Sequence, residues 1–307
     1  MKCARFVSIP VFSVFLVLGF VYYITIFVFL EDWLGLQSSA GSLNALIFTY
    51  LACFSLFSFL VCVLTDPGGV PSAYVPDVED SELSDQDSKK TGTRLSQCDK
   101  CSSYKPPRTH HCRSCRRCIL RMDHHCMWIN NCVGLRNYKA FIVLVLYATM
   151  ASIYSSALTC LGCSSKLHSS EGLEFLWNGF PQDLLPGSGK CRFLTIVSSL
   201  IPLLFWCSLI TFISGVIIVG LSLTLGTLLG WHIYLILHNM TTIEYYEAIR
   251  AAWLARKSGQ SYRHPYNVGI YKNITLVLGP NMLNWLCPTA VNHIKDGITF
   301  PTIRDSS

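Results

Sequence analysis

Charged side chains are scarce in this chain: only 14% of its 307 residues are Asp, Glu, Lys or Arg. The long stretch Phe193–Leu237 holds no Asp, Glu, Lys or Arg. Hydrophobic residues make up 51%, and the mean hydropathy is +0.40, which excludes an ordinary soluble domain and fits the membrane class. Nothing in the chain resembles a nucleic-acid-binding module. The net charge of +6 instead fits anionic lipid or a phosphate-bearing cofactor as partner.

Long apolar runs predict an all-α polytopic membrane protein. A hydrocarbon core of about 30 Å needs about 20 apolar residues in a helix. Four runs meet this length, at about Val7–Leu30, Leu43–Leu64, Ala140–Gly162 and Gly215–Leu237. The first is longer than a signal-peptide core, and Glu31-Asp32-Trp33 follows it in place of a small-residue cleavage site, so we expect a retained span.

Lys and Arg are unevenly distributed among the loops, and this predicts the topology. Loop 66–138 and the region after Tyr245 are rich in both, whereas loop 31–42 has neither. Cytosolic loops carry the positive excess, so both termini and loop 66–138 are expected in the cytosol. That arrangement needs an even number of spans, so 193–212 is expected to be an interfacial or re-entrant segment on the far side.

A metal-ligand pattern, C-x2-C-x9-H-x6-C, occurs twice, and the second copy lies 14 residues after the first. Three thiolates and one imidazole form a closed tetrahedral set for a structural Zn²⁺, so we expect two structural zinc ions. A disulfide-rich loop is the alternative, but the histidines recur in register and the positive flanks indicate the reducing cytosol. The two ligand sets are Cys98, Cys101, His111 and Cys118, then Cys112, Cys115, His125 and Cys132.

One cysteine, Cys126, is left over and is the expected nucleophile. In the 14-residue register it opens a third copy, whose other positions are Ile129, Lys139 and Leu146, which do not form a metal site. A thiolate is activated by a neighbouring imidazole, and His125 is taken by zinc, whereas His124 is free. Asp123 can orient His124 as the base, which makes these residues orienter, base and nucleophile. The alternative role for Asp123 and His124 is support of the zinc ligands.

The position of Cys126 narrows the range of possible substrates, because a membrane span begins only 13 residues later, at Lys139. A thiol at the membrane surface meets substrates that are partly in water and partly in lipid, and long-chain acyl-CoA is such a thioester. We therefore expect Cys126 to take the acyl chain from acyl-CoA and pass it to a cysteine of another protein. Trp128 and Phe141 are candidates to line the acyl slot, with interfacial anchoring as their alternative role.

The string Asp123-His124-His125-Cys126 within the doubled zinc pattern resembles the DHHC protein S-acyltransferases, or palmitoyltransferases. Two further motifs extend the resemblance over most of the chain: Asp66-Pro67-Gly68 after the second span, like the family's DPG, and Thr241-Thr242-Ile243-Glu244 after the fourth, like its TTxE. The stretch His264-Pro265-Tyr266-Asn267 is similar to the family's C-terminal Asn-Pro-Tyr-Asp, from which it departs at both ends. The whole pattern is similar to plant members of the endomembrane system.

The resemblance implies a four-helix membrane domain, a cytosolic zinc domain and an acyl-Cys126 intermediate. By the same resemblance Thr242 reaches the active-site Asp123, and Asn273 docks the tail on the membrane domain. Lys105, Arg108 and His110 become candidates for CoA phosphate contacts, with a solvated basic face as the alternative, and Ala151 stands near the end of the acyl slot. A Golgi membrane is the expected location, with the endoplasmic reticulum, vesicles and the plasma membrane as alternatives.

These expectations divide the chain into five parts and leave two other functional classes open. The first alternative is a membrane-anchored zinc adaptor, which predicts that function survives removal of Cys126. The second is a transporter, which needs polar or charged residues within the spans, where almost none are expected. The parts are a hairpin of two spans at 1–65, a linker with an acidic disordered stretch at 66–97, the zinc domain at 98–138, the third and fourth spans with a lumenal segment at 139–238, and the tail at 239–307.

Overall fold

The computed structural model of the chain is mostly helical and describes residues 8–76, 96–178, 187–291, 293 and 296–304, without the side chains of residues 96, 163 and 166–208. Four helical segments in this part of the chain are long and apolar enough to cross a membrane, in agreement with the four predicted runs. They are Ile9–Trp33, Ser39–Leu64, Tyr138–Gly162 and Leu209–Leu237. The chain therefore fits a multi-pass membrane protein. The acidic stretch expected to be disordered lies outside the described residues.

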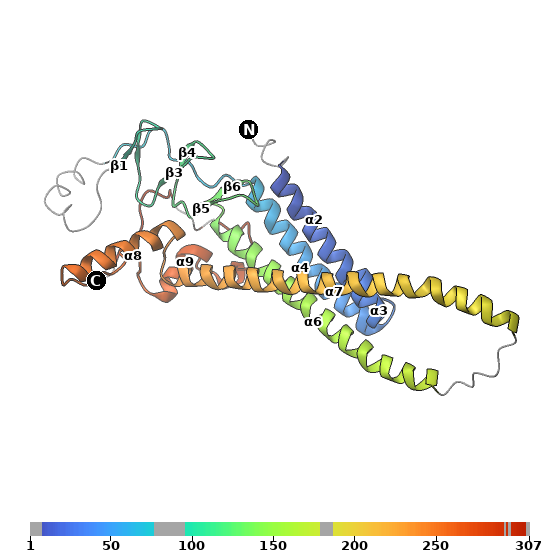
Figure 1. Ribbon diagram of the computed structural model, residues 1–307. Coiled ribbons are helices and arrows are strands. Elements are labelled where there is room, and N and C mark those ends of the chain that lie inside the picture. The colour runs from blue at the N-terminus through green and yellow to red at the C-terminus, as the bar shows by residue number, and fades with distance from the viewer. Residues whose placement is uncertain (1–7, 77–95, 179–186, 292, 294–295, 305–307) are drawn as a thin grey trace. The chain divides into compact units, whose positions relative to one another are not determined.

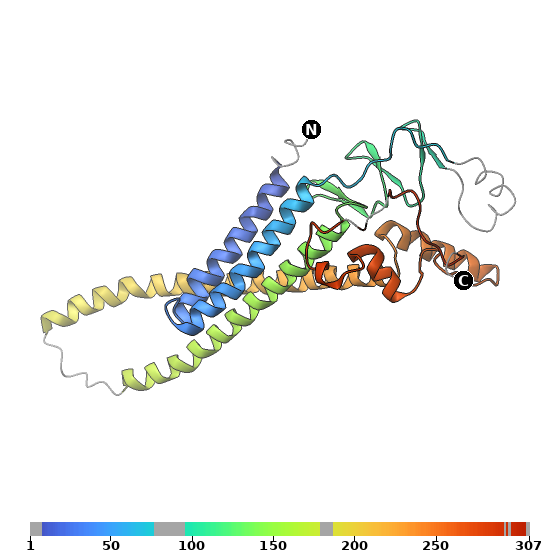
Figure 2. The ribbon, with the colours of Figure 1, turned by 180° about the vertical axis from the view of Figure 1, so that it is seen from behind.

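The helices that carry these segments follow one another along the chain as Figures 1 and 2 show. The first segment is built from α2 (Ile9–Tyr23), the π-helix η1 (Ile24–Leu30) and α3 (Glu31–Trp33). The others belong to α4 (Ser39–Leu64), α6 (Tyr138–Asn178) and α7 (Gly187–Leu237). The contacts divide the chain into two compact units, unit 1 with residues 1–15, 54–146 and 227–307, and unit 2 with residues 16–53 and 147–226.

Residues 193–212 differ from the prediction of a separate interfacial or re-entrant segment. The backbone of this stretch belongs to α7, which continues without interruption into the fourth span. No glycine or proline break separates the two, since Pro202 is followed by ordinary helix-compatible residues up to Gly215. Residues 193–212 and the fourth span therefore form one continuous helix and not two separate segments.

The spans also carry more buried polar groups than the sequence led us to expect. In unit 2 the Thr25 and Ser155 hydroxyls lie 2.6 Å apart, and those of Ser156 and Ser222 lie 2.9 Å apart. Thr25 also donates to the carbonyl of Val21 one turn earlier. Because these hydroxyls have hydrogen-bond partners, burying them in an apolar environment costs little free energy, and they add contacts between helices. They have the character of packing contacts.

Between α4 and α6 the chain forms three short antiparallel hairpins, all in unit 1. They are β1 (Ser96–Cys98) with β2 (Ser103–Lys105), β3 (His110–Cys112) with β4 (Arg117–Ile119), and β5 (His124–Cys126) with β6 (Asn131–Val133). Each turn contains a non-glycine residue with positive φ, and these residues, Ser102, Arg116 and Asn130, are 14 positions apart. The 14-residue sequence repeat is therefore a repeat of one hairpin, and the third copy folds like the first two.

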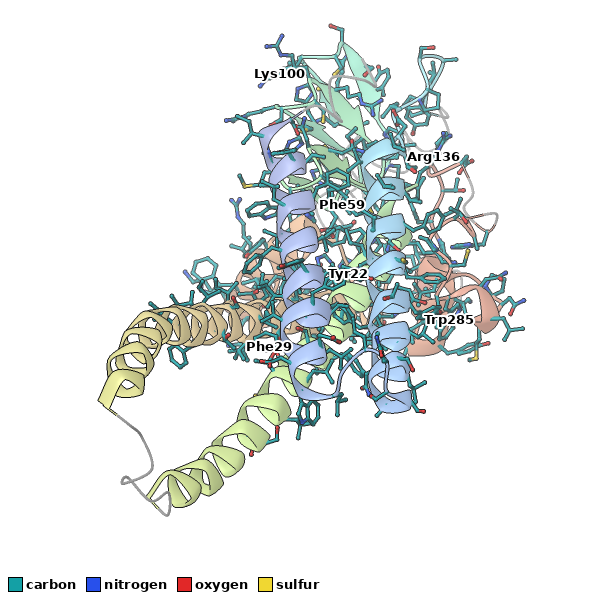
Figure 3. The ribbon with its side chains drawn as sticks, turned by 90° about the vertical axis from the view of Figure 1, so that its right-hand side faces the viewer. Tyr22, Phe29, Phe59, Lys100, Arg136 and Trp285 are labelled. Carbon is teal, nitrogen blue, oxygen red and sulfur yellow. The ribbon has the colours of Figure 1, made fainter. Side chains whose placement is uncertain are left out.

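The third hairpin packs on the membrane helices of unit 1. Cys126, Ile129 and Val133 share one apolar core with residues of α4, of α6 and of the last turns of α7. Phe59 of α4 belongs to the same core and meets the ring of Phe15 of α2 edge-on, with 5.4 Å between centroids (Figure 3). Burial of this apolar surface fixes the hairpin against the ends of the spans.

Residues 66–68 join the end of α4 to the second hairpin. Asp66 accepts hydrogen bonds from the Gly68 N–H at 2.9 Å and from the Arg117 guanidinium at 2.7 Å. Gly68 has a φ of +103°, which only glycine adopts readily, and its carbonyl accepts from the Leu120 N–H. The DPG sequence is thus a turn that ties a membrane helix to the zinc-binding region.

The tail binds the hairpins through a buried ion pair. Helix α8 (Thr242–Lys257) begins with a capping box in which Thr241 and Glu244 exchange hydrogen bonds. Glu244 also receives two hydrogen bonds from Arg108, at 2.6 and 2.7 Å. The side chains of Arg108 and Glu244 are only 1% and 7% exposed. The remaining elements of the tail are α9 (Ile270–Leu278) and the 3₁₀ turn η3 (Met282–Asn284).

The Arg108–Glu244 pair generates a stability prediction. Glu244→Ala leaves a buried guanidinium without its carboxylate, which costs about 3–5 kcal/mol of stability. We expect the thermal unfolding midpoint of the purified chain in detergent to fall by several degrees. Glu247→Gln, an exposed position on the same helix, is the control and should leave the midpoint unchanged. Equal midpoints for the two variants would contradict a stabilising role for the pair.

Candidate active site

The third hairpin has the geometry of the first two but lacks the complete pair of turn cysteines that would begin a third ligand set. Cys126 takes the place that Cys98 and Cys112 hold in the first two copies. The position equivalent to Cys101 and Cys115 is Ile129, which is buried in the apolar core. The third copy therefore presents its first cysteine with no metal to bind it.

The two ligand sets each come together as the sequence predicted, and each has all four ligand atoms within 4.8 Å of one another. In a tetrahedral zinc site with Zn–S of about 2.3 Å and Zn–N of about 2.0–2.1 Å, neighbouring ligand atoms lie about 3.4–3.8 Å apart. The observed separations agree: 3.3–3.9 Å from the His111 Nδ1 to its three sulfurs, and 3.5–3.6 Å from the His125 Nδ1 to its own. Both sets can hold a metal ion.

The strand register explains how adjacent residues serve different metals. His111 pairs with Cys118 across β3 and β4, and His125 pairs with Cys132 across β5 and β6. Each pair supplies two ligands of one set. Cys112 follows His111 on the extended strand, points the other way and joins the second set. The second metal site thereby fixes both strands of the hairpin that carries Cys126.

Asp123 and His124 form a tight pair at the start of this hairpin. The His124 Nδ1 lies 2.7 Å from the Asp123 Oδ2, and Asp123 is only 1% exposed. Thr242 donates to both carboxylate oxygens, from its N–H to Oδ1 and from its hydroxyl to Oδ2, each at 2.9 Å. The carboxylate is therefore fully engaged, and because it binds Nδ1, the other ring nitrogen of His124 is left to interact with Cys126. Burial acts to raise the pKa of Asp123, but these hydrogen bonds hold it below its usual range.

His124 and Cys126 shift each other's pKa in the direction that a nucleophilic thiol needs. Burial works against a charged His124, but its hydrogen bonds to Asp123 and Cys126 raise its pKa to about 9. Burial also acts to raise the pKa of Cys126, but the His124 hydrogen bond and the backbone N–H groups of Trp128 and Ile129 lower it below its usual value. Both shifts favour the imidazolium–thiolate form of the pair over the neutral form.

Two residues that sequence reasoning missed complete the surroundings of His124. His232 of α7 is 2% exposed, and its ring centroid lies 6.1 Å from that of His124. Its Nδ1 lies 3.2 Å from the Tyr138 hydroxyl. Phe141 of α6, a predicted site residue, meets the His124 ring edge-on at 5.3 Å. The signal for His232 was present in the sequence, because a lone histidine in an apolar span is a functional candidate.

The remaining acyl-CoA candidates have mixed outcomes. The Arg108 guanidinium is buried against Glu244 and Asn239, so a contact with a CoA phosphate would have to compete with these partners and stays a prediction. Lys105 of β2 and His110 of β3 are half-buried. Trp128 is 56% exposed, in the turn of the third hairpin. Ala151 is buried on α6 within unit 2. For these four residues a part in substrate binding remains a prediction.

The supporting residues of the tail all lie in unit 1 and bind its backbone or its carboxylates. Thr241 and Glu244 form the cap of α8, and Thr242 binds Asp123. Asn273 of α9 is fully buried and donates to the Leu237 carbonyl at the end of α7, at 2.7 Å, and to Asn267 at 2.8 Å. The variant stretch His264-Pro265-Tyr266-Asn267 thus supplies Asn267 as the acceptor for Asn273.

Comparison with known proteins agrees with this geometry. Residues 92–249, just over half of the chain, match the sequence model of a family described as DHHC palmitoyltransferase. Probable protein S-acyltransferase 15 of Arabidopsis thaliana is 57% identical over 289 residues, which cover 94% of this chain and 100% of the relative. Probable protein S-acyltransferase 16 of the same plant is 48% identical, covering 97% and 94%. Palmitoyltransferase ZDHHC2 of Homo sapiens is 30% identical over 67% of this chain and 46% of its own length. Motif, geometry and relatives agree, and the chain belongs to the DHHC palmitoyltransferase family.

Proposed function

We propose that this protein transfers a long-chain acyl group, palmitoyl, from acyl-CoA to cysteine thiols of membrane-associated proteins, through a thioester on Cys126. The observation that carries the proposal is the Asp123–His124–Cys126 arrangement, in which a buried carboxylate orients an imidazole beside a thiolate. Family membership supports the reaction class. The named relatives are described as S-acyltransferases or palmitoyltransferases of proteins.

In the first step the Cys126 thiolate attacks the thioester carbonyl of acyl-CoA. The carbonyl–sulfur bond to CoA breaks, the new bond to the Cys126 Sγ forms, and the departing CoA sulfur takes its proton from the His124 imidazolium. Asp123 and Thr242 hold the imidazole in the orientation that this proton transfer needs. The step exchanges one thioester for another, so it needs positioning and an activated thiolate and no further energy source.

In the second step a cysteine of the substrate protein attacks the acyl-Cys126 thioester. Neutral His124 accepts the proton of the incoming thiol, and the acyl group leaves Cys126 as the thiolate is restored. The sum is acyl-CoA plus a protein thiol giving a protein thioester plus CoA. Phe141 and His232 beside His124 provide an apolar, water-poor wall for the reacting groups.

Zinc is the metal we propose for both ligand sets, because closed sites of three thiolates and one imidazole suit Zn²⁺ in a structural role. The ions would hold the hairpins in register and so fix the position of Cys126, without contact with the substrate. Asp123, His124 and Cys126 would carry out the acyl transfer.

We place the reaction at the cytosolic face of an endomembrane, with both termini in the cytosol and the Golgi as the first candidate. The excess of Lys and Arg in loop 66–138 and after Tyr245 supports this orientation. The thiol lies on a hairpin packed against the ends of the spans, where both an acyl chain in the bilayer and a cytosolic cysteine are within reach.

The acyl intermediate is tested by labelling purified protein with radiolabelled palmitoyl-CoA. We expect hydroxylamine-sensitive label on the wild type and none on Cys126→Ser, because the proposed thioester forms on the Cys126 sulfur. Cys53→Ser, at an exposed cysteine of α4, is the matched control and should keep the label. Metal content is measured in all three to exclude a folding defect. A metal-loaded wild type without label, or label that persists in Cys126→Ser, would contradict the proposal and favour a zinc adaptor.

The role of Asp123 generates a second prediction. Asp123→Asn removes the acceptor that orients His124, so the single-turnover rate of Cys126 acylation should fall about 10²–10⁴-fold. Thr242→Val removes one hydrogen bond to that carboxylate and should cost about tenfold. Asp296→Asn, at an exposed aspartate of the tail, serves as control. Unchanged acylation in Asp123→Asn would show that this carboxylate only supports the fold.

A further inference from the structure

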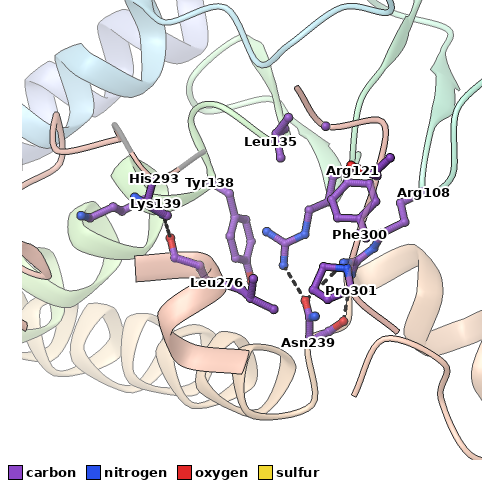
Figure 4. A pocket seen from close by; sticks show the side chains of 13 residues that line it. Arg108, Arg121, Leu135, Tyr138, Lys139, Asn239, Leu276, His293, Phe300 and Pro301 are labelled. Atoms are coloured by element: carbon purple, nitrogen blue, oxygen red, sulfur yellow. Dashed lines mark hydrogen bonds between the residues drawn. The ribbon is translucent and has the colours of Figure 1, made fainter. Parts of the chain in front are cut away.

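A cavity lies in unit 1, and its lining does not include the proposed catalytic residues. Its volume is about 370 Å³, within the ordinary range of small-ligand sites, which begins at about 300 Å³. Its lining includes Arg121, Tyr138, Lys139, Asn239 and Phe300, and none of Asp123, His124 and Cys126. Figure 4 shows the Arg121 guanidinium among Tyr138, Phe300 and Asn239.

The cavity carries positive charge without enough negative charge to balance it. Arg108 at its edge is neutralised by Glu244. Lys139 is buried, and within the described part of the chain it donates to the carbonyls of Leu278 and Ala290 and to no carboxylate. Arg121 is 8% exposed, and among the described residues it makes one hydrogen bond, from Nη2 to the Asn239 Oδ1 at 3.2 Å, besides lying over the Tyr138 ring. Four of the five N–H donors of Arg121 thus have no acceptor in this part of the chain.

The carboxylates that act on Arg121 are already engaged elsewhere. These are Glu244, bound in both oxygens to Arg108, and Asp123, bound to His124 and Thr242. Burial and the neighbouring Arg108 lower the pKa of Arg121 to about 10, so it remains charged at neutral pH. A buried charge is costly unless an opposite charge and hydrogen-bond acceptors meet it. The missing partner is therefore an anion with several acceptor oxygens.

The surroundings of the cavity belong to the membrane surface. Tyr138 and Lys139 open the third span, and Leu276 and Val277 of the amphipathic helix α9 form another part of the wall. The first turn of α9 exposes Ile270 and Tyr271, which are 63% and 64% accessible. A short helix with an exposed apolar face beside a basic site is typical of contact with the lipid interface.

We propose that this cavity binds a phosphate group, with Arg121 as its principal ligand. A guanidinium pairs with phosphate through two parallel hydrogen bonds, and its free donors face the cavity. Two sources share this chemistry, the headgroup of an anionic phospholipid and a soluble phosphate ester. The site is separate from the acyl-transfer chemistry, so its occupancy does not depend on Cys126.

The test uses the full-length chain in detergent, as the Cys126→Ser variant, so that acyl transfer plays no part. Thermal unfolding is followed while dioctanoyl phosphatidic acid, dioctanoyl phosphatidylcholine, glycerol 3-phosphate or CoA is added. Arg121→Gln removes the proposed ligand, Arg121→Lys keeps the charge without the fork, and Arg250→Gln removes an exposed charge on α8 as the matched control. Zinc content and the unfolding midpoint without additive report whether each variant folds.

We expect saturable stabilisation by phosphatidic acid and none by phosphatidylcholine. The half-saturating concentration should rise about tenfold or more in Arg121→Gln, less in Arg121→Lys, and not in Arg250→Gln. Stabilisation by glycerol 3-phosphate at similar concentrations would assign the site to a soluble ester, and its absence would assign it to lipid. The proposal is overturned if no phosphate probe stabilises the chain or if Arg121→Gln responds like the parent. It is also overturned if CoA stabilises the chain through Arg121 while phosphatidic acid and glycerol 3-phosphate do not, because the cavity would then belong to the acyl-CoA site.

Discussion

Two Cys₃His ligand sets impose the constraint on which the rest of the site depends. The strands that form the hairpins are three residues long, and few apolar residues lie between the ligands. Metal must therefore supply much of the stability of this region. Because the sets are interleaved, with His111 and Cys112 in different ones, each hairpin is tied to the next. The third hairpin has the same geometry, and its first cysteine, Cys126, is the proposed nucleophile.

The second constraint comes from the residues just after α7. Thr242 binds the carboxylate of Asp123, and Glu244 binds Arg108, so the start of α8 contacts both the Asp123–His124 pair and the hairpins. Asn273 in turn ties α9 to the last carbonyl of α7. The orientation of His124 therefore depends on tail residues more than 100 positions away in sequence. The residues after α7, the capping box of α8 and the Asp123 carboxylate form one hydrogen-bonded network, which links the TTxE sequence to the Asp-His-His-Cys string.

The sequence was informative where spacing dictates geometry. The 14-residue repeat predicted both ligand sets and the odd thiol, and hydropathy predicted four spans, because each follows from local order along the chain. The sequence was less informative where the partner of a residue is distant along the chain. Arg108 was expected to be a free basic residue, but its guanidinium is paired with Glu244. His232 was passed over within an apolar run, although it lies beside His124. The continuous helix through 193–212 was also missed, because charge topology constrains the number of spans but not the local backbone.

The most direct test of this account is the metal itself, measured as zinc content and zinc X-ray absorption on the purified, acyl-accepting chain. The account predicts two zinc ions per chain, each with three sulfur ligands at about 2.3 Å and one nitrogen at about 2.0–2.1 Å. A folded, active chain with fewer than two zinc ions, or with these cysteines paired as disulfides, would contradict it.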